Sequence, residues 1–428
     1  MTTTRRAILS TLGAAGLALP ITAAHAQAAT LDPRSTADQS QRFADMLGEA
    51  AASGDAIFLP PGRYRLADVA LPDGTVIGGV PGRTVLVASG SGPILRTSDT
   101  ARITLSGLTL DGEGRGGEDA LLIVERCERL IAEGCELRGG RGHGIRTSGT
   151  GGRIAGNLLE DHGEAAIFAT DALGLDISHN RVRRCGNNGV LVWTTEPAED
   201  GTRVTDNHIS DIGAQRGGTG ENGNGVNVFR AAGVTVAGNR ITDCAFSAVR
   251  NNGGANAQIR GNSCERIGEV AIYAEFAFDG VVIADNIVAD AAVGISITNM
   301  REGGRLAVCS GNLVRAIRDR SPTENRGVGI SVEADASVTG NVVEGAPRMG
   351  LQLGFGPYLR DVTASGNTIR DAAIGIGVSV ADGAGGALVT GNTLSGCTTP
   401  LAAMRWDEVA ASSFDGAANI THGLNRVA

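Results

Sequence analysis

A four-residue phrase ending in Asn recurs ten times between residues 154 and 396, and it constrains the fold more than any other feature. An aliphatic or small residue comes first, two small or polar residues follow, and a strand-like run comes after the Asn. The repeated residues are Asn157, Asn180, Asn207, Asn239, Asn262, Asn286, Asn312, Asn341, Asn367 and Asn392. Their mean spacing is (392 − 157)/9, about 26 residues. A period of this length indicates stacked units that cannot bury their apolar faces alone.

A second phrase follows each Asn, in which Gly or Ala starts a run of alternating aliphatic and polar residues. Gly189-Val-Leu-Val and Gly225-Val-Asn-Val are two copies. Alternation with a period of two predicts short strands with one face inward. Two or three such strands per repeat, joined by turns rich in Gly, Asn and Asp, predict an all-β parallel β-helix of roughly 12 coils. We expect the Asn amides of adjacent coils to hydrogen-bond along the axis.

Composition excludes several classes of function. The formal charge is −9, and all 37 basic residues are Arg. An acidic chain without a basic run is a poor candidate for nucleic-acid binding. Without Lys, a lysine base or Schiff base is impossible. The 64 Gly residues suit many tight turns.

The first 26 residues have the pattern of a twin-arginine signal peptide. Arg5 and Arg6 precede a short apolar run, and Ala24-His-Ala26 resembles a cleavage site. The apolar run is shorter than the roughly 20 residues that span a bilayer. We therefore expect export by the twin-arginine machinery, a mature chain that begins near Gln27 without a membrane span, and a periplasmic or secreted location.

The rest of the chain divides into three predicted parts. Residues 27–100 hold a capping helix and the first coils, 101–400 the β-helix repeats, and 401–428 a C-terminal cap. Within 36–53, an amphipathic helix is predicted from the spacing of Phe43, Met46, Leu47 and Ala50, and it would cover the first coil.

The first coils resemble a known superfamily. Ile57-Phe-Leu-Pro-Pro-Gly-Arg-Tyr64 and Leu108-Thr-Leu-Asp-Gly112 resemble phrases of the pectate-lyase superfamily. These are right-handed parallel β-helix proteins that include polysaccharide lyases, pectin-type glycoside hydrolases and epimerases. With its leader, the chain also resembles a family of twin-arginine-translocated repeat proteins. The resemblance implies right-handed coils, while one fold hosts many reactions.

Stacked second-phrase strands would point two columns of side chains outward. Between residues 146 and 275 these columns are rich in Arg, aromatic residues, Asn and Glu. Aromatic rings offer apolar faces to sugars, and Arg holds carboxylates in bidentate fashion, which indicates a polysaccharide partner, possibly one rich in uronic acid. The predicted substrate-binding residues are Phe168, Trp193, Asn227, Phe229, Arg250, Asn252, Tyr273 and Glu275. The alternative is that these aromatics pack under the long turn at 212–224.

Gly142-His143-Gly144 resembles the Gly-His-Gly element of pectin-type glycoside hydrolases. Coil alignment brings Asp119 and Glu164 near His143, with Arg146 beside them, a set suited to acid/base chemistry. We predict Asp119, His143, Arg146 and Glu164 as catalytic residues. The acid and base motifs of those hydrolases are absent, so lyase or epimerase chemistry on acidic glycans is favoured. The alternative is a non-catalytic envelope protein that recognises a glycan or another surface component.

Other titratable residues receive structural interpretations. His162, His179 and His208 are predicted at solvated turns. The seven Cys residues are predicted mostly as small residues of the coil wall. An Asp four residues after five of the repeated Asn residues predicts turn structure, although such a column could hold calcium weakly. No metal or other cofactor is predicted. The five Asp residues are Asp161, Asp211, Asp243, Asp290 and Asp371.

Overall fold

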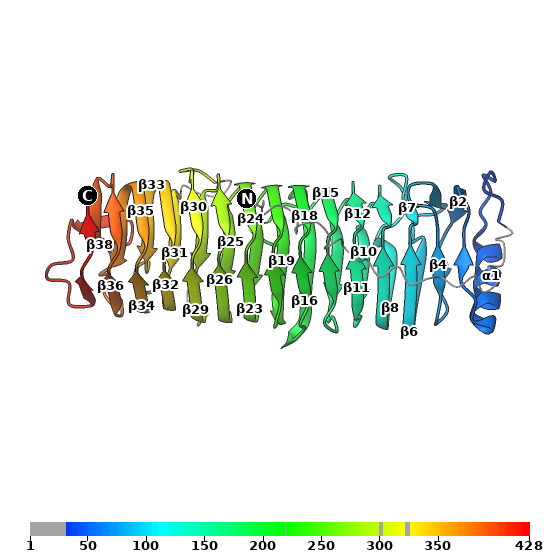
Figure 1. Cartoon of the computed structure of the whole chain (residues 1–428), viewed down its shortest axis with the longest axis horizontal. Helices are drawn as coiled ribbons and strands as arrows, with labels where there is room; N and C mark the ends of the chain where they lie inside the picture. The colour runs from blue at the N-terminus through cyan, green and yellow to red at the C-terminus, as the bar shows by residue number, and fades with distance from the viewer. Residues whose placement is uncertain (1–30, 219, 299–302, 322–325) are drawn as a thin grey trace, which may run out of the picture.

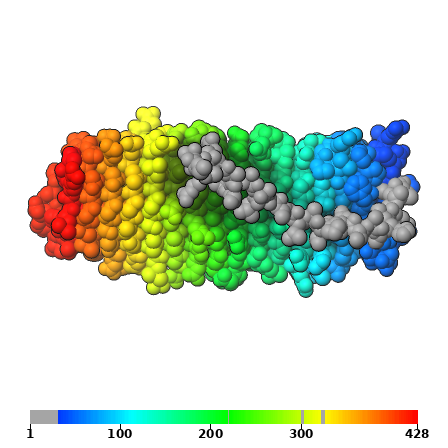
Figure 2. Space-filling model, in the orientation of Figure 1, coloured from blue at the N-terminus to red at the C-terminus, as the bar shows by residue number. Residues whose placement is uncertain are grey.

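The computed structural model describes residues 31–218, 220–298, 303–321 and 326–428, so the predicted signal peptide lies outside the described residues. The chain forms an elongated solenoid whose coils follow sequence order, with the helix at one end and the last strands at the other (Figures 1 and 2). About 13 turns of parallel strands confirm the predicted fold class. Within the described part of the chain, no helix is long and apolar enough to cross a membrane.

Each coil passes through three faces, here called A, B and C, and strands of one face pair in parallel from coil to coil. Strands β6 and β8 continue from face A into face B, and β33 and β35 continue from face C into face A. Face A contains β3 (Val69–Ala70), β6 (Leu95–Ser106), β8 (Ala120–Glu133), β10 (His143–Ser148), β13 (Ala165–Thr170), β16 (Asn188–Glu199), β19 (Asn224–Ala232), β22 (Val249–Asn252), β25 (Val270–Glu275), β28 (Val293–Ile297), β31 (Val328–Val332), β33 (Val342–Leu353), β35 (Thr368–Ser379) and β38 (Thr399–Arg405), with the antiparallel β39 (Glu408–Ala411) at its end.

Faces B and C are separated by the turn that carries the repeated Asn. Face B further contains β1 (Ile57–Phe58), β4 (Val76–Gly78), β11 (Gly152–Ala155), β14 (Asp176–Ser178), β17 (Arg203–Thr205), β20 (Thr235–Ala237), β23 (Ala255–Arg260), β26 (Asp279–Ala284), β29 (Arg305–Ser310), β32 (Ala334–Thr339), β34 (Arg360–Ser365), β36 (Ala387–Thr390) and β40 (Ile420–Gly423). Face C further contains β2 (Gly62–Leu66), β5 (Thr84–Ala88), β7 (Thr109–Asp111), β9 (Glu136–Arg138), β12 (Leu158–Glu160), β15 (Arg181–Cys185), β18 (His208–Ile212), β21 (Arg240–Cys244), β24 (Ser263–Ile267), β27 (Ile287–Ala289), β30 (Leu313–Arg315), β37 (Thr393–Ser395) and β41 (Arg426–Val427).

The repeated Asn residues form a continuous ladder inside the turn between faces B and C. Nδ2 of Asn207 donates to Oδ1 of Asn239 at 3.0 Å and to the Ile177 carbonyl at 2.9 Å. The same Oδ1 accepts the backbone N–H of Asn207 at 2.9 Å. This pattern runs through all ten repeats and continues to Asn425, while the backbone N–H of Cys135 donates to Oδ1 of Asn157 at the other end. The predicted stacking and bonding along the axis are confirmed.

The helix α1 (Ser40–Ser53) covers the first coil with Phe43, Leu47 and Ala50 buried. It begins four residues later than predicted. Asp38 forms a β-bridge with Arg65, and the side chain of Gln39 bonds the backbone of the preceding loop, so these residues stay outside the helix.

The five recurrent Asp residues have φ between 53° and 59°, the left-handed conformation of a turn, which confirms their structural interpretation. Arg184 pairs with Asp161, and Arg266 pairs with Asp243 on the preceding coil. All seven Cys residues are free, and six of them are buried in the coil wall, as predicted.

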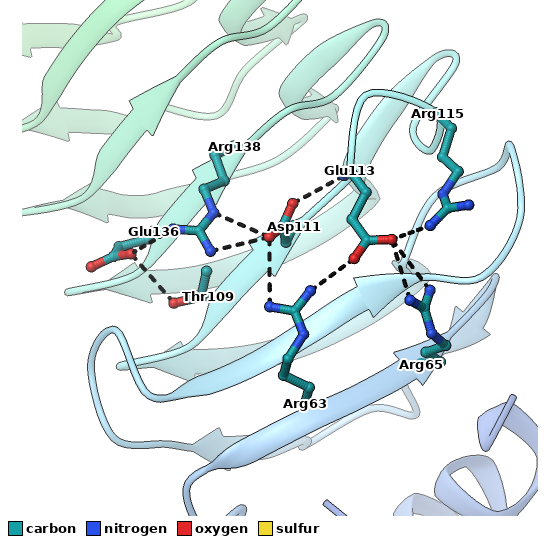
Figure 3. Close-up of polar contacts among 8 residues, drawn as sticks. All are labelled: Arg63, Arg65, Thr109, Asp111, Glu113, Arg115, Glu136 and Arg138. Carbon is teal, nitrogen blue, oxygen red and sulfur yellow. Dashed lines mark hydrogen bonds and ion pairs between the residues drawn. The ribbon is translucent and has the colours of Figure 1, made fainter. Parts of the chain in front are cut away.

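Coils at the N-terminal end are joined outside the core by a network of Arg and carboxylate side chains on face C (Figure 3). Glu113 lies at its centre and pairs with Arg63, Arg65 and Arg115. Asp111 accepts hydrogen bonds from Arg138 at 3.1 and 3.2 Å. The network links β2, β7 and β9 and spans four coils, because β5 lies between β2 and β7.

Replacing Glu113 with Gln should destabilise the protein slightly at neutral pH, by about 1 kcal/mol or less because the network is partly solvated. The hydrogen bond from Arg115 lowers the pKa of the Glu113 carboxyl below its ordinary value. Its stabilisation is therefore present above that ordinary value and is lost as the pH falls through the lowered pKa. Thermal melts of E113Q and wild type should differ at pH 7 and converge in acid. E49Q, on the exposed side of α1, should melt like wild type throughout; a difference that persists in acid contradicts the prediction.

Candidate functional site

The strand pairing places the face A side chains in the two outward columns expected from the sequence. Arg146 pairs with Phe168, and Asn227 pairs with Arg250 and through it with Tyr273. In the second column, Trp193 pairs with Phe229. Asn252 pairs with Glu275 one coil further on. Parallel pairing sets these rungs about 4.8 Å apart.

Four rings form a ladder along face A. His143 contacts Phe168 at 5.1 Å between ring centroids, Phe168 contacts Trp193 at 5.2 Å, and Trp193 contacts Phe229 at 5.5 Å. All four residues are partly exposed. The buried indole N–H of Trp193 has no hydrogen-bond partner among the described residues. A row of tilted, partly exposed rings is suited to a ligand with apolar ring faces.

The ladder opens into a cleft of about 460 Å³. Trp193, Phe229 and Phe276 supply its apolar walls, and Asn252 and Glu221 supply polar edges. The aromatics therefore line a groove beside the long turn instead of being wholly covered by it. We call the face A surface from Phe168 to Phe276 the aromatic groove.

Arg250 does not lie free in the aromatic groove. Its guanidinium forms two hydrogen bonds with Glu275, at 2.5 and 2.8 Å, and both side chains are less than 10% exposed. Gly220 lies against the guanidinium, and a Cβ added there would collide with it. Two Asn side chains hold this loop in place. Nδ2 of Asn224 donates to the Gly220 carbonyl, and Nδ2 of Asn188 donates to the Glu221 carbonyl.

Burial dominates the electrostatics of this pair. It raises the pKa of the Glu275 carboxyl despite the opposing charge of Arg250. Burial also raises the pKa of Tyr273, whose ring packs 5.0 Å from the Arg250 guanidinium carbon. Asn252 donates to Glu275 at 3.1 Å. Of the predicted binding residues, Arg250 and Glu275 thus form a buried pair that supports the floor of the aromatic groove, and the partly exposed Tyr273 packs against this pair.

The four predicted catalytic residues come together at the N-terminal end of the aromatic groove. Nη1 of Arg146 lies 2.7 Å from Asp119. The backbone N–H of Ala165 donates to Nδ1 of His143 at 3.1 Å. A neutral imidazole in this position carries its proton on Nε2 and offers a donor. Burial lowers the pKa of His143 to about 4, so the ring is neutral at pH 7.

Each carboxylate of this set has an arginine partner. Asp119 pairs with Arg146, and Glu164 pairs with Arg216 at 2.6 Å and accepts a hydrogen bond from Asn187. Neither is an unpartnered general base. The arrangement offers a neutral histidine donor between two ion pairs, which can bind a sugar hydroxyl or carboxylate oxygen.

The prediction of a solvated turn is wrong for His162, which is buried. Its Nε2 lies 3.1 Å from the Leu137 carbonyl, and the ring packs against Gly140 and Gly144, where no side chain stands in the way. Burial lowers its pKa to about 4. His162 belongs to the coil wall beneath His143.

Two further features were not singled out from the sequence. A second hollow of about 290 Å³ continues along face A past Tyr273 to Gln352 and Phe355. Phe355 packs edge-on against Trp406 at 5.1 Å. Arg230, in β19, lies with its guanidinium carbon 4.8 Å from the centre of the Phe229 ring. An aromatic residue in a Gly-Pro loop, Gly354-Phe-Gly-Pro, was the available signal for the second hollow.

Metal ligands do not converge anywhere in the described ranges, where no group of three or more His, Cys, Asp or Glu side chains could hold an ion. The aromatic groove consists of rings, amides and paired charges.

Stacked parallel coils, an internal Asn ladder and an aromatic groove on one face define a right-handed parallel β-helix protein. The sequence matches the family described as right handed beta helix region over residues 82–199 and 197–358, and the chain belongs to this family. No curated protein matches the chain in sequence.

Solved structures share this fold at low sequence identity. The N-terminal fragment of bacteriophage phi29 gene product 12 is 13% identical with a TM-score of 0.52, over 93% of this chain and 71% of that one. The enzymatically active domain of tailspike protein 2 of bacteriophage CBA120 is 13% identical with a TM-score of 0.50, over 77% and 50%. The A-module of the mannuronan C-5 epimerase AlgE6 of Azotobacter vinelandii is 15% identical with a TM-score of 0.46, over 94% and 98%. These likenesses concern the fold.

Proposed function

We propose that the protein binds a polysaccharide chain along the aromatic groove of face A. The ladder of Phe168, Trp193 and Phe229 carries this proposal, because its ring spacings of 5.2 and 5.5 Å repeat along the solenoid axis. A linear glycan presents an apolar ring face and hydroxyl groups at a comparable repeat. Export to the envelope, predicted from the first 26 residues, would place the protein among such polymers.

A second candidate function is processing of the glycan at the His143 end, by a lyase or epimerase acting on uronic-acid sugars. It is favoured by one observation: neutral His143 touches the first ring of the ladder and lies beside the Asp119–Arg146 pair. Chemistry there requires one of the paired carboxylates, or His143 in its other tautomer, to take a proton.

One screen tests both functions. Uronic-acid and neutral polysaccharides are titrated against the protein calorimetrically, and ultraviolet absorbance follows any unsaturated product. Binding without new absorbance supports a glycan-binding protein, whereas absorbance that disappears in H143A establishes a lyase. Epimerisation is followed by NMR of the recovered polymer. If no polymer in either class binds and none is altered, the proposed function is wrong.

A further inference from the structure

Arg230 differs from the other arginines along the aromatic groove. Arg146, Arg216 and Arg250 each form an ion pair with a carboxylate. Nη1 of Arg230 donates only to the Thr195 carbonyl, at 3.1 Å, and the described part of the chain gives Arg230 no carboxylate partner. Its side chain is exposed at the rim beside Phe229.

Other arginines with the same backbone conformation as Arg230 do form ion pairs. Arg126, Arg184 and Arg266 share its left-handed conformation, with φ of 49°, 54° and 55° against 60° for Arg230. Each of those three reaches an Asp on the preceding coil: Nε of Arg126 lies 2.6 Å from Asp99. The distances for the other two are 2.7 Å.

At the corner opposite Arg230, the preceding coil departs from the repeat. The pairing of β16 with β19 shifts register between Trp193 and Ala198, so extra residues occupy the place where a partner Asp would stand. The guanidinium turns instead over the Phe229 ring. The ring holds the orientation of the cation and shields one side of it from water. The donors Nε and Nη2 form no hydrogen bond with a protein acceptor among the described residues.

We propose that Arg230 binds the carboxylate of an acidic sugar whose ring lies on the Trp193–Phe229 part of the ladder. This inference rests on the proposed function and names its substrate class, a uronic-acid polysaccharide. Arg230, and not Arg250 as predicted from the sequence, would then be the arginine that binds the substrate's carboxylate. A planar guanidinium with free donors matches a carboxylate, and the adjacent rings take the sugar face. Arg230 is thus the specificity-determining residue, whereas Arg250 supports the floor.

The test compares each of two uronate polymers, alginate and polygalacturonate, with its carboxyl-reduced form by titration calorimetry. Wild type should prefer the uronate form, and R230Q should lose about tenfold in affinity for it because a charge-assisted hydrogen bond is removed. Affinity for the reduced form should stay unchanged. R230K should fall between the two, since it keeps the charge without the fork. R266Q, with the same backbone conformation on face C, is the matched control and should bind like wild type.

The outcomes are separable. If wild type binds both forms equally, or if R230Q weakens both forms alike, the assignment of Arg230 is overturned while polysaccharide binding stands. If R230Q matches wild type on the uronate form, the assignment is also overturned. If wild type binds neither form of either polymer, the uronate assignment is overturned, and the neutral polymers of the wider screen then decide the proposed function.

Discussion

Replacing Trp193 with Ala should lower the affinity for the bound polysaccharide by about 10- to 100-fold, the effect typical of a central Trp anchor. Trp193 contacts the rings on both sides of it, Phe168 and Phe229, and lines the cleft. Its removal deletes the middle of the ladder and the largest apolar face offered to a sugar. Calorimetric titration with the best polymer from the screen measures the loss.

Two variants sharpen this result. W193F keeps a ring face of smaller area, so its affinity should lie between those of wild type and W193A. F58A removes an exposed aromatic side chain on face B, outside the aromatic groove, and should bind like wild type. Equal losses in W193A and F58A would show that the effect is general destabilisation, and no loss in W193A would rule out the ladder as the binding surface.

Replacing Asn239 with Ala should destabilise the solenoid by about 3 kcal/mol or more, because buried polar groups lose partners on two coils. Its Oδ1 accepts from the backbone and side-chain amides of Asn207, and its Nδ2 donates to the Val204 carbonyl and to Asn262. Alanine leaves the backbone N–H of Asn207 and the Val204 carbonyl buried without these bonds. Denaturant unfolding followed by circular dichroism measures the change.

Asn425 provides the matched control at the end of the ladder. N425A removes the same side chain where it is only partly buried and where no further Asn follows in the ladder. Its effect should be clearly smaller than that of N239A. N239D keeps the acceptor but loses both donor bonds and buries a charge, so it should be at least as destabilising as N239A. Equal stabilities of N239A and N425A would contradict a role for burial in the ladder.

Features that repeat with the coil could be predicted from the sequence. The period fixed the fold class, the Asn ladder and the register of the outward columns, because inward aliphatic residues such as Val190 and Val226 allow only one alignment of neighbouring strands. The left-handed turns at the recurrent Asp residues could be predicted for the same reason. All of these features depend only on a residue and on the equivalent residue one coil away.

Features that depend on departures from the repeat could not be predicted. Arg250 is in the expected column, but its pairing with Glu275 and its cover by Gly220 depend on a loop held by Asn side chains of two coils. The freedom of Arg230 follows from a register shift in the preceding coil. Burial of His162 depends on the glycines beside it.

The Asn ladder also makes the two ends of the solenoid chemically unequal. Nδ2 of each repeated Asn from Asn157 to Asn392 donates to Oδ1 of the Asn on the next coil, and the last acceptor is Asn425, so the amide dipoles all point the same way. Like the peptide dipoles of an α-helix, they add, with the positive end at the last coil and the negative end at Cys135. The ladder therefore gives the molecule an electrical direction along its axis, and its own contribution favours an anion at the Asn425 end and a cation at the Cys135 end.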